Sequence, residues 1–318
     1  MATDYVLFIH GVNTRDEREN PTYAKELITQ LEHVVTRNIN LKPIPLFWGD
    51  VNKDPEDDLR KQLMDQNGCW DKLWFKDFRQ KQLLQFSGDA ALYISRSIGT
   101  KVVDRLKKDA ERGLAGYQEG DRLHLVTHSW GTVILFDALF AARWDESNLP
   151  EYDGARRIRK FIFGVEPNPR GGIPLASIHT MGSPIALFSL ISVTQRNSPD
   201  GVVVNTHDLT QQLQELLENL YTRRGRKLPW RNFIHPGDPV AWPLEKVIPM
   251  LVDGDSQYLD IKDVVTHKAD LSDFLFEPAS QTALALVHGG DAHGSYFTSM
   301  EVAQEIAQTI QAQAEKAG

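Results

Sequence analysis

The sequence predicts an α/β fold with a mostly parallel β-sheet, formed by one domain over residues 1–318. Two observations carry this prediction. Short β-prone runs alternate with longer stretches of helical periodicity, which is typical of βαβ units. The runs are also continuously apolar, as expected for parallel strands that helices cover on both faces. No internal repeat and no linker divides the chain, so its 318 residues fit one large domain.

Three strands are predicted in the first half of the chain: Tyr5–Ile9, Leu41–Trp48 and Leu123–Val126. Two prolines in the second of them suit only the start of a strand or an edge strand. Helical periodicity follows or precedes these strands at Thr22–Arg37, Asp89–Arg112 and Thr132–Ala142.

Three further strands are predicted in the second half: Ala176–Pro184, which ends in a tight turn, Trp230–His235 and Tyr258–Val265. Helices are expected at Leu209–Arg224 and Glu301–Gln313. Between the two halves, Asp145–Arg156 is interpreted as a polar loop, and Phe161–Gly164 as a short strand or part of a cap.

Residues 52–88 have a different composition, polar and acidic at first and then rich in large aromatic side chains. Two interpretations stay open: a segment that covers the mouth of a site, or an amphipathic helix that buries its aromatics in the core. Residues 189–228 are a second candidate lid or cap segment.

Composition excludes several classes of function. The net charge of −8, with no basic stripe, argues against a nucleic-acid partner. One cysteine, Cys69, excludes an intramolecular disulfide and a cysteine-rich metal site. No apolar run is long enough to span a membrane, and no signal peptide is visible, so a cytoplasmic location is expected, with a processed secreted form as the alternative. The oligomeric state stays open.

The most informative segment is Leu123–Val133, in which an apolar strand ends at Ser129 and a helix starts almost at once. A serine at such a sharp strand-to-helix turn projects its hydroxyl from the top of the sheet, where the parallel strands end. Gly131 allows the helix to pack close behind the turn. In the usual Gly-x-Ser-x-Gly pattern the first position is glycine, whereas here it is Thr127. The turn alone leaves two interpretations open, a nucleophile and an ordinary turn.

Taken in order, the motifs resemble those of the α/β-hydrolase superfamily, on the side of its serine esterases and lipases. The resemblance covers nearly the whole chain. The matching pieces are His10-Gly11, the turn from Thr127 to Gly131, Met181-Gly182-Ser183-Pro184, Gly237-Asp238-Pro239-Val240, and His293 followed by Ser295-Tyr296. The chain starts at the strand that normally comes third in this family. The resemblance therefore implies a three-layer αβα sandwich with a reduced sheet of about six strands and with cap or lid excursions.

The resemblance also implies the chemistry. Ser129 would attack an acyl carbonyl, His293 would act as its base, and Asp238 would orient the imidazole. The order Ser, Asp, His along the chain is that of the superfamily. The oxyanion would be held by the backbone N–H groups of Val12 and Trp130. His10, Gly11 and His128 are expected to shape or line the substrate site, with His10 shaping the oxyanion loop by hydrogen bonding.

Other residues compete for these roles. His288, His267 and His235 are rival bases, and Asp253, Asp255 and Asp260 are rival acids. Ser183 is expected to be structural because Pro184 after it has no N–H to offer an oxyanion. A metal site built from His10, Asp50, Asp291 and His293 lacks a helical His pair or a carboxylate cluster, so no metal is expected. No glycine-rich loop indicates a bound nucleotide, so no cofactor is expected.

The predicted activity is hydrolysis of carboxylic esters, with short- to medium-chain acyl or aryl groups, and a small-molecule ester as substrate. The same residues would also serve a lipase, a thioesterase or an acyltransferase. An alternative from another class is a catalytically idle hydrolase fold that only binds a partner.

Overall fold

The computed structural model describes residues 2–12, 14, 21–51, 57–58, 61–62, 96–145, 152–187, 209–253, 256–266 and 292–316. Its centre is a six-stranded sheet in the order β2-β1-β3-β4-β5-β6, in which every neighbouring pair is parallel. The strands are β1 (Thr3–Ile9), β2 (Asn40–Leu46), β3 (Arg122–His128), β4 (Leu175–Met181), β5 (Leu228–Ile234) and β6 (Leu259–Val265). All six predicted strands are present.

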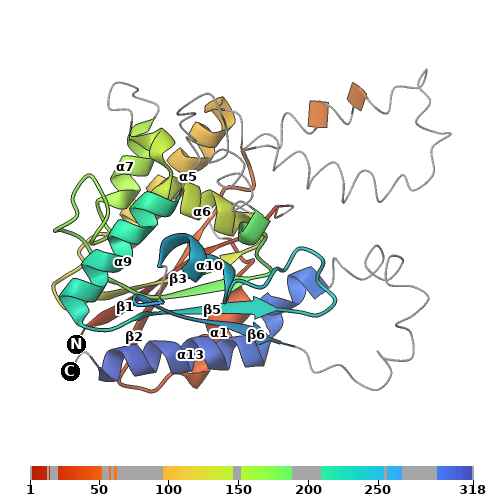
Figure 1. The fold of residues 1–318 in the computed structure, drawn as a ribbon. Coiled ribbons are helices and arrows are strands. Elements are labelled where there is room, and N and C mark those ends of the chain that lie inside the picture. Colours follow the sequence, from red (N-terminus) through yellow and green to blue (C-terminus); the bar gives the residue numbers. More distant parts are fainter. Residues whose placement is uncertain are drawn as a thin grey trace, which may run out of the picture.

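Helices cover both faces of this sheet (Figure 1). On one face pack α5 (Arg96–Leu114), α6 (Trp130–Phe140), α7 (Asp153–Arg159), α9 (Thr210–Arg224) and α10 (Val247–Val252). On the other face pack α1 (Lys25–Val34) and α13 (Met300–Glu315). The fold is therefore the predicted three-layer sandwich of the α/β-hydrolase type, with the reduced parallel sheet.

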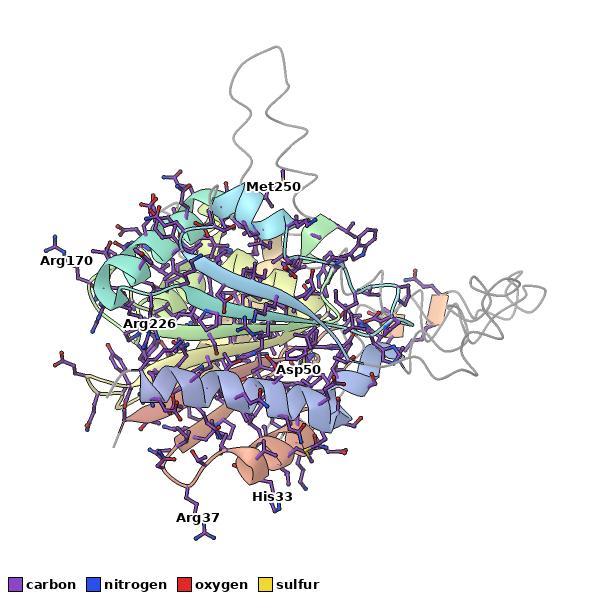
Figure 2. The ribbon with its side chains drawn as sticks, turned by 60° about the horizontal axis from the view of Figure 1, so that its bottom comes forward. His33, Arg37, Asp50, Arg170, Arg226 and Met250 are labelled. Carbon is purple, nitrogen blue, oxygen red and sulfur yellow. The ribbon has the colours of Figure 1, made fainter. Side chains whose placement is uncertain are left out.

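The two helical layers present different side chains to solvent, and Figure 2 labels some of them. His33 and Arg37 point away from the sheet at α1, on the side of the molecule that α13 shares. On the opposite side, Met250 projects outward from α10 and is 80% exposed. None of the described helices combines the length and the apolar character needed to cross a membrane.

The prolines of β2 fit its place in the sheet. β2 is an edge strand and pairs only with β1, where Pro43 lies opposite Val6 and Pro45 opposite Phe8. Proline has no N–H to donate, and alternate residues of an edge strand need no partner on the open side. Of the two expected positions, the start of a strand and an edge strand, the edge strand is the one observed.

The polar loop expected at Asp145–Arg156 is partly wrong. Helix α7 begins at Asp153, and it buries Ala155 and Ile158 against the core. A helix of seven residues is too short for its apolar periodicity to stand out from a polar sequence. The short helix α10 also escaped prediction. The Phe161–Gly164 segment forms no strand of the sheet, but Ile162 makes an isolated parallel bridge with Ile173.

The two candidate lid segments lie mostly outside the described residues. Of residues 52–88, only 57–58 and 61–62 are described. The described end of the second segment, 209–228, contains α9, whose apolar side is buried in the core beneath it through Leu213, Leu216, Leu217 and Leu220.

A row of buried polar side chains crosses the sheet on the face that α1 and α13 cover. His124 bonds Asp4 at 3.0 Å through Nε2 and the Ser177 hydroxyl at 2.7 Å through Nδ1. Ser177 in turn contacts Nε2 of His179 at 2.8 Å. All four side chains are inaccessible to solvent. Arg122 closes the row with two hydrogen bonds to the Asp4 carboxylate, each 2.7 Å long.

We expect acid to destabilise this fold well above the pH at which carboxylates titrate. Burial lowers the pKa of His124, His179 and His128, the last to about 3, so all three are neutral when folded. In an unfolded chain histidine titrates near pH 6.5, so below that pH unfolding takes up protons. The free energy of unfolding therefore decreases as pH falls from about 6.5 towards the folded-state pKa values of these histidines. The decrease is up to about 1.4 kcal/mol per pH unit for each histidine. Urea unfolding between pH 7.5 and 4.5 measures this slope, and a flat profile would contradict it.

Candidate active site

The predicted nucleophile, Ser129, occupies a sharp turn between β3 and α6. Its φ of 54° and ψ of −135° are strained for a residue with a side chain. Two backbone hydrogen bonds hold the turn: the Ser129 N–H donates to Met181 O (2.9 Å), and the Thr132 N–H donates to Ser129 O (3.0 Å). The predicted strand-to-helix turn is thus present, and neighbouring strand β4 supports it.

Thr127, in place of the usual glycine, is accommodated by polar contacts inside the core. Its hydroxyl oxygen lies 2.9 Å from the Thr132 hydroxyl in the first turn of α6. The same hydroxyl reaches the carbonyl of His179 on β4 at 3.5 Å. The threonine therefore links the strand before the turn to the helix after it, and the turn keeps its shape.

Three residues far apart in sequence form one hydrogen-bonded chain. The Ser129 Oγ lies 2.7 Å from His293 Nε2, and His293 Nδ1 lies 2.9 Å from Asp238 Oδ2. Because an ionised carboxylate only accepts, Nδ1 carries the proton and Nε2 is left to accept from the serine hydroxyl. Asp238 follows β5 by four residues, and His293 precedes the short helix η5 (Ser295–Thr298) and then α13.

The carboxylate of Asp238 is buried but well supplied with donors. Burial alone would raise its pKa, yet the hydrogen bond and charge of His293, the N–H of Val240 and the hydroxyl of Tyr296 together lower it. Val240 donates to Oδ1 at 2.9 Å, and Tyr296 donates to Oδ2 at 2.8 Å. Asp238 is therefore a fixed negative charge behind the imidazole.

His128 lies directly against His293, with ring centroids 4.6 Å apart. Its Nε2 donates to the backbone carbonyl of His293 at 2.7 Å, since a carbonyl can only accept. Burial, and then the charge of His293, lower the pKa of His128 to about 3. It remains uncharged, so it places no second positive charge beside an imidazolium at His293.

His10 supports the loop after β1 from behind. Its Nδ1 donates to the carbonyl of Gly11 at 2.7 Å, and its Nε2 accepts from the N–H of Trp48 at 3.2 Å. The imidazole stacks on the Trp48 indole with centroids 5.2 Å apart, and it is inaccessible to solvent. The C=O of Gly11 and the N–H of Val12 belong to one trans peptide and point in opposite directions. By holding the carbonyl, His10 turns the Val12 N–H away from itself.

Two glycines allow the loop after β1 and the serine turn to touch. A Cβ on Gly11 would lie 2.5 Å from Ser129 Cβ and 2.9 Å from its Oγ. A Cβ on Gly131 would lie 2.1 Å from the carbonyl oxygen of His10. The predicted close packing at Gly131 is therefore present. The segment that packs against Gly131 is the loop after β1, which carries the Val12 N–H.

Two further residues of this site, Tyr296 and Gly182, had no role predicted for them from the sequence. Tyr296 contacts Asp238, as described above. Gly182, with a φ of +55°, leaves room for the acid and the base: a Cβ there would lie 2.6 Å from Asp238 Oδ2 and 3.0 Å from His293 Nδ1. Both residues occur in the matched motifs, and that is the only signal of them in the sequence.

The described rivals for the base and the acid have other partners. His235 accepts from the N–H of Gly237, Asp253 accepts from the backbone N–H groups of residues 257–259, and Asp260 pairs with Arg231. Ser183 is buried and its Oγ accepts from the N–H of Ile185 at 3.3 Å. His267, His288, Asp255 and Asp291 lie outside the described residues.

Within the described part of the chain, no group of three or more His, Cys, Asp or Glu side chains is arranged to hold a metal ion. Asp50, one of the residues considered for a metal, instead pairs with Arg105 at 3.2 Å.

No protein-family model and no curated protein matches the sequence. Among solved structures, the chain is similar to a dienelactone hydrolase from Anabaena variabilis, with 13% identity, a TM-score of 0.32, and coverage of 91% of this chain and 85% of that one. It is also similar to ClbQ from the colibactin NRPS/PKS pathway, with 10% identity, a TM-score of 0.35 and 98% coverage of both chains. An inhibited esterase B from Lactobacillus rhamnosis shows 11% identity and a TM-score of 0.34, over 99% of this chain and 80% of that one. At such identities, what the site can do chemically has to follow from its own geometry.

Proposed function

We propose that this α/β-hydrolase-fold protein is a serine hydrolase that cleaves carboxylic esters through an acyl-enzyme on Ser129. The observation that carries the proposal is the continuous chain of hydrogen bonds from the Ser129 hydroxyl through His293 to Asp238, at 2.7 and 2.9 Å. A serine alcohol is a weak nucleophile at neutral pH and needs a base within hydrogen-bond reach. The position of His293 within hydrogen-bond reach of Ser129, and of Asp238 within reach of His293, supports these roles.

In the proposed reaction, Ser129 Oγ attacks the acyl carbon as His293 Nε2 takes the hydroxyl proton. His293 then returns this proton to the leaving alcohol, and the acyl group stays on the serine. Water, activated by the same imidazole, attacks the acyl-enzyme and releases the acid. Asp238 stabilises the imidazolium that forms in both halves and does not itself take up the proton.

The negative charge of each tetrahedral intermediate requires donors beside Ser129. The N–H of Trp130 lies in the first turn of α6, where the helix dipole favours an anion. The N–H of Val12 lies in the loop that His10 fixes and that Gly11 brings against the serine. We propose these two groups as the oxyanion hole; a lost donor of this kind typically costs about 3–4 kcal/mol of transition-state stabilisation.

We expect a fluorophosphonate probe to attach once per chain, at the peptide that contains Ser129. The probe reports an activated serine because only a serine with a working base displaces fluoride at a useful rate. Intact mass followed by peptide mapping measures this. The folded protein should then hydrolyse p-nitrophenyl acetate and butyrate faster than a C16 ester. A folded protein that neither labels at Ser129 nor hydrolyses any acyl ester, thioester or amide of such a panel would contradict the proposal.

A further inference from the structure

Tyr296 is the only tyrosine in the described part of the chain whose side chain is fully buried against the proposed acid. It lies three residues after His293 and belongs to the core cluster beneath α13. Its hydroxyl accepts from the backbone N–H of His235 at 2.8 Å and donates to Asp238 Oδ2 at 2.8 Å. The Tyr296 hydroxyl thus links the backbone just after β5, at His235, to Asp238, and it does so from the same segment that carries His293.

The contact with Asp238 falls on the same oxygen that His293 uses. Oδ2 accepts from His293 Nδ1 at 2.9 Å and from the Tyr296 hydroxyl, while Oδ1 accepts from Val240. Burial, and then the charge of Asp238, raise the pKa of Tyr296 far above its ordinary range, so the phenol keeps its proton and remains a donor. Two donors therefore share one carboxylate oxygen.

The packing around Tyr296 leaves its ring little freedom. A Cβ on Gly182 would lie 2.9 Å from the ring atom Cε2 of Tyr296, and the ring of His128 lies 5.9 Å away between centroids. The hydroxyl is consequently fixed at Oδ2 by the fold.

We propose that Tyr296 is a positioning residue that holds Asp238 Oδ2 in place. Its hydrogen bond sets how strongly the Asp238 carboxylate stabilises a protonated His293. The proposal rests on the proposed serine-hydrolase function. Each donor draws electron density from the oxygen that it binds, so a second donor weakens the hold of Asp238 on a protonated His293. This competition at Oδ2 would favour the return of the proton from His293 to the leaving alcohol.

The test is Tyr296→Phe, which removes the hydroxyl and keeps the ring. Without the competing donor, the acid limb of the kcat/KM profile for p-nitrophenyl butyrate should move to higher pH by about half a unit to one unit. The NMR titration midpoint of the ¹⁵N-labelled His293 ring should move in the same direction by the same amount. The NMR arm needs no turnover, so it tests Tyr296 even if the protein proves not to hydrolyse esters.

A matched control is Ser177→Ala, which also removes a buried hydroxyl with two hydrogen-bonding partners, on the same face of the sheet but at the other end of β4. It should lower the unfolding temperature and leave both the profile and the midpoint of His293 unchanged. If Tyr296→Phe lowers stability in the same way but leaves the His293 midpoint unchanged or moves it down, Tyr296 is only a packing residue and the proposal is overturned.

Discussion

Replacing Ser129 with alanine is expected to reduce kcat/KM for p-nitrophenyl butyrate by a factor of about 10⁵ to 10⁶, the size of loss seen when the nucleophile of a serine hydrolase is removed. Alanine keeps the Cβ and the backbone of the turn but has no Oγ for the proton transfer to His293. The two backbone hydrogen bonds of the turn, from the Ser129 N–H to Met181 O and from the Thr132 N–H to Ser129 O, involve no side-chain atom of Ser129 and should remain. Steady-state kinetics measure the loss, and circular dichroism with thermal unfolding checks the fold.

The matched control is Ser183→Ala. Ser183 is also a buried serine near the end of a strand, but its Oγ accepts from the Ile185 N–H and takes no part in the hydrogen-bonded chain of Ser129, His293 and Asp238. This variant should keep the fluorophosphonate label and turnover within a few-fold of the wild type. Ester turnover that survives in a folded Ser129→Ala protein would show that another group is the nucleophile.

The second large effect is expected from Gly11→Ala. The new methyl carbon would lie 2.5 Å from Ser129 Cβ and 2.9 Å from Ser129 Oγ, so the loop after β1 must move away from the serine. Ser129 cannot give way easily, because its N–H is bonded to Met181 and its backbone is already strained. Moving the loop displaces the Val12 N–H, and a lost oxyanion donor lowers kcat by a factor of about 10² to 10³.

Gly294→Ala tests whether this effect is local. Gly294 is next to His293, yet a Cβ there meets nothing within 4 Å and its φ of −86° suits any residue. Kinetics and thermal unfolding should separate the two variants. Gly294→Ala should stay near wild type, whereas Gly11→Ala should be folded with kcat lowered by about 10² to 10³. A Gly11→Ala protein with normal kcat would contradict the assigned place of the oxyanion.

Much of the fold could be predicted because buried parallel strands leave a strong local signal. The run Tyr5–Ile9 is apolar at every position and became the core of β1, and the prolines of 41–48 restricted their position to the start of a strand or an edge strand. Helix α7 could not be predicted in the same way, because its seven residues span fewer than two full turns of periodicity. What fixes it is packing against α5 and α6, which is a tertiary effect.

The parts of the site that could be predicted are those in which the local structure restricts one position to one or a few residue types. Ser129 at a strand end and Gly131 behind it are such positions. The contacts of His128 with His293 and of Tyr296 with Asp238 join residues 165 and 58 positions apart. No local pattern reports such pairs, because they exist only once α13 and its preceding turn dock on the sheet.

The spacing of the hydrogen-bonded residues has a consequence for the protein during its synthesis. His293 follows Ser129 by 164 residues. At roughly 5–20 residues per second, a ribosome needs on the order of ten seconds to add them. Throughout that interval the proposed nucleophile, Ser129, lacks the proposed base, so we expect the nascent chain to be inert towards esters and towards fluorophosphonates. Pulse labelling of newly made chains with a fluorophosphonate would therefore date the moment at which the segment that carries His293 docks.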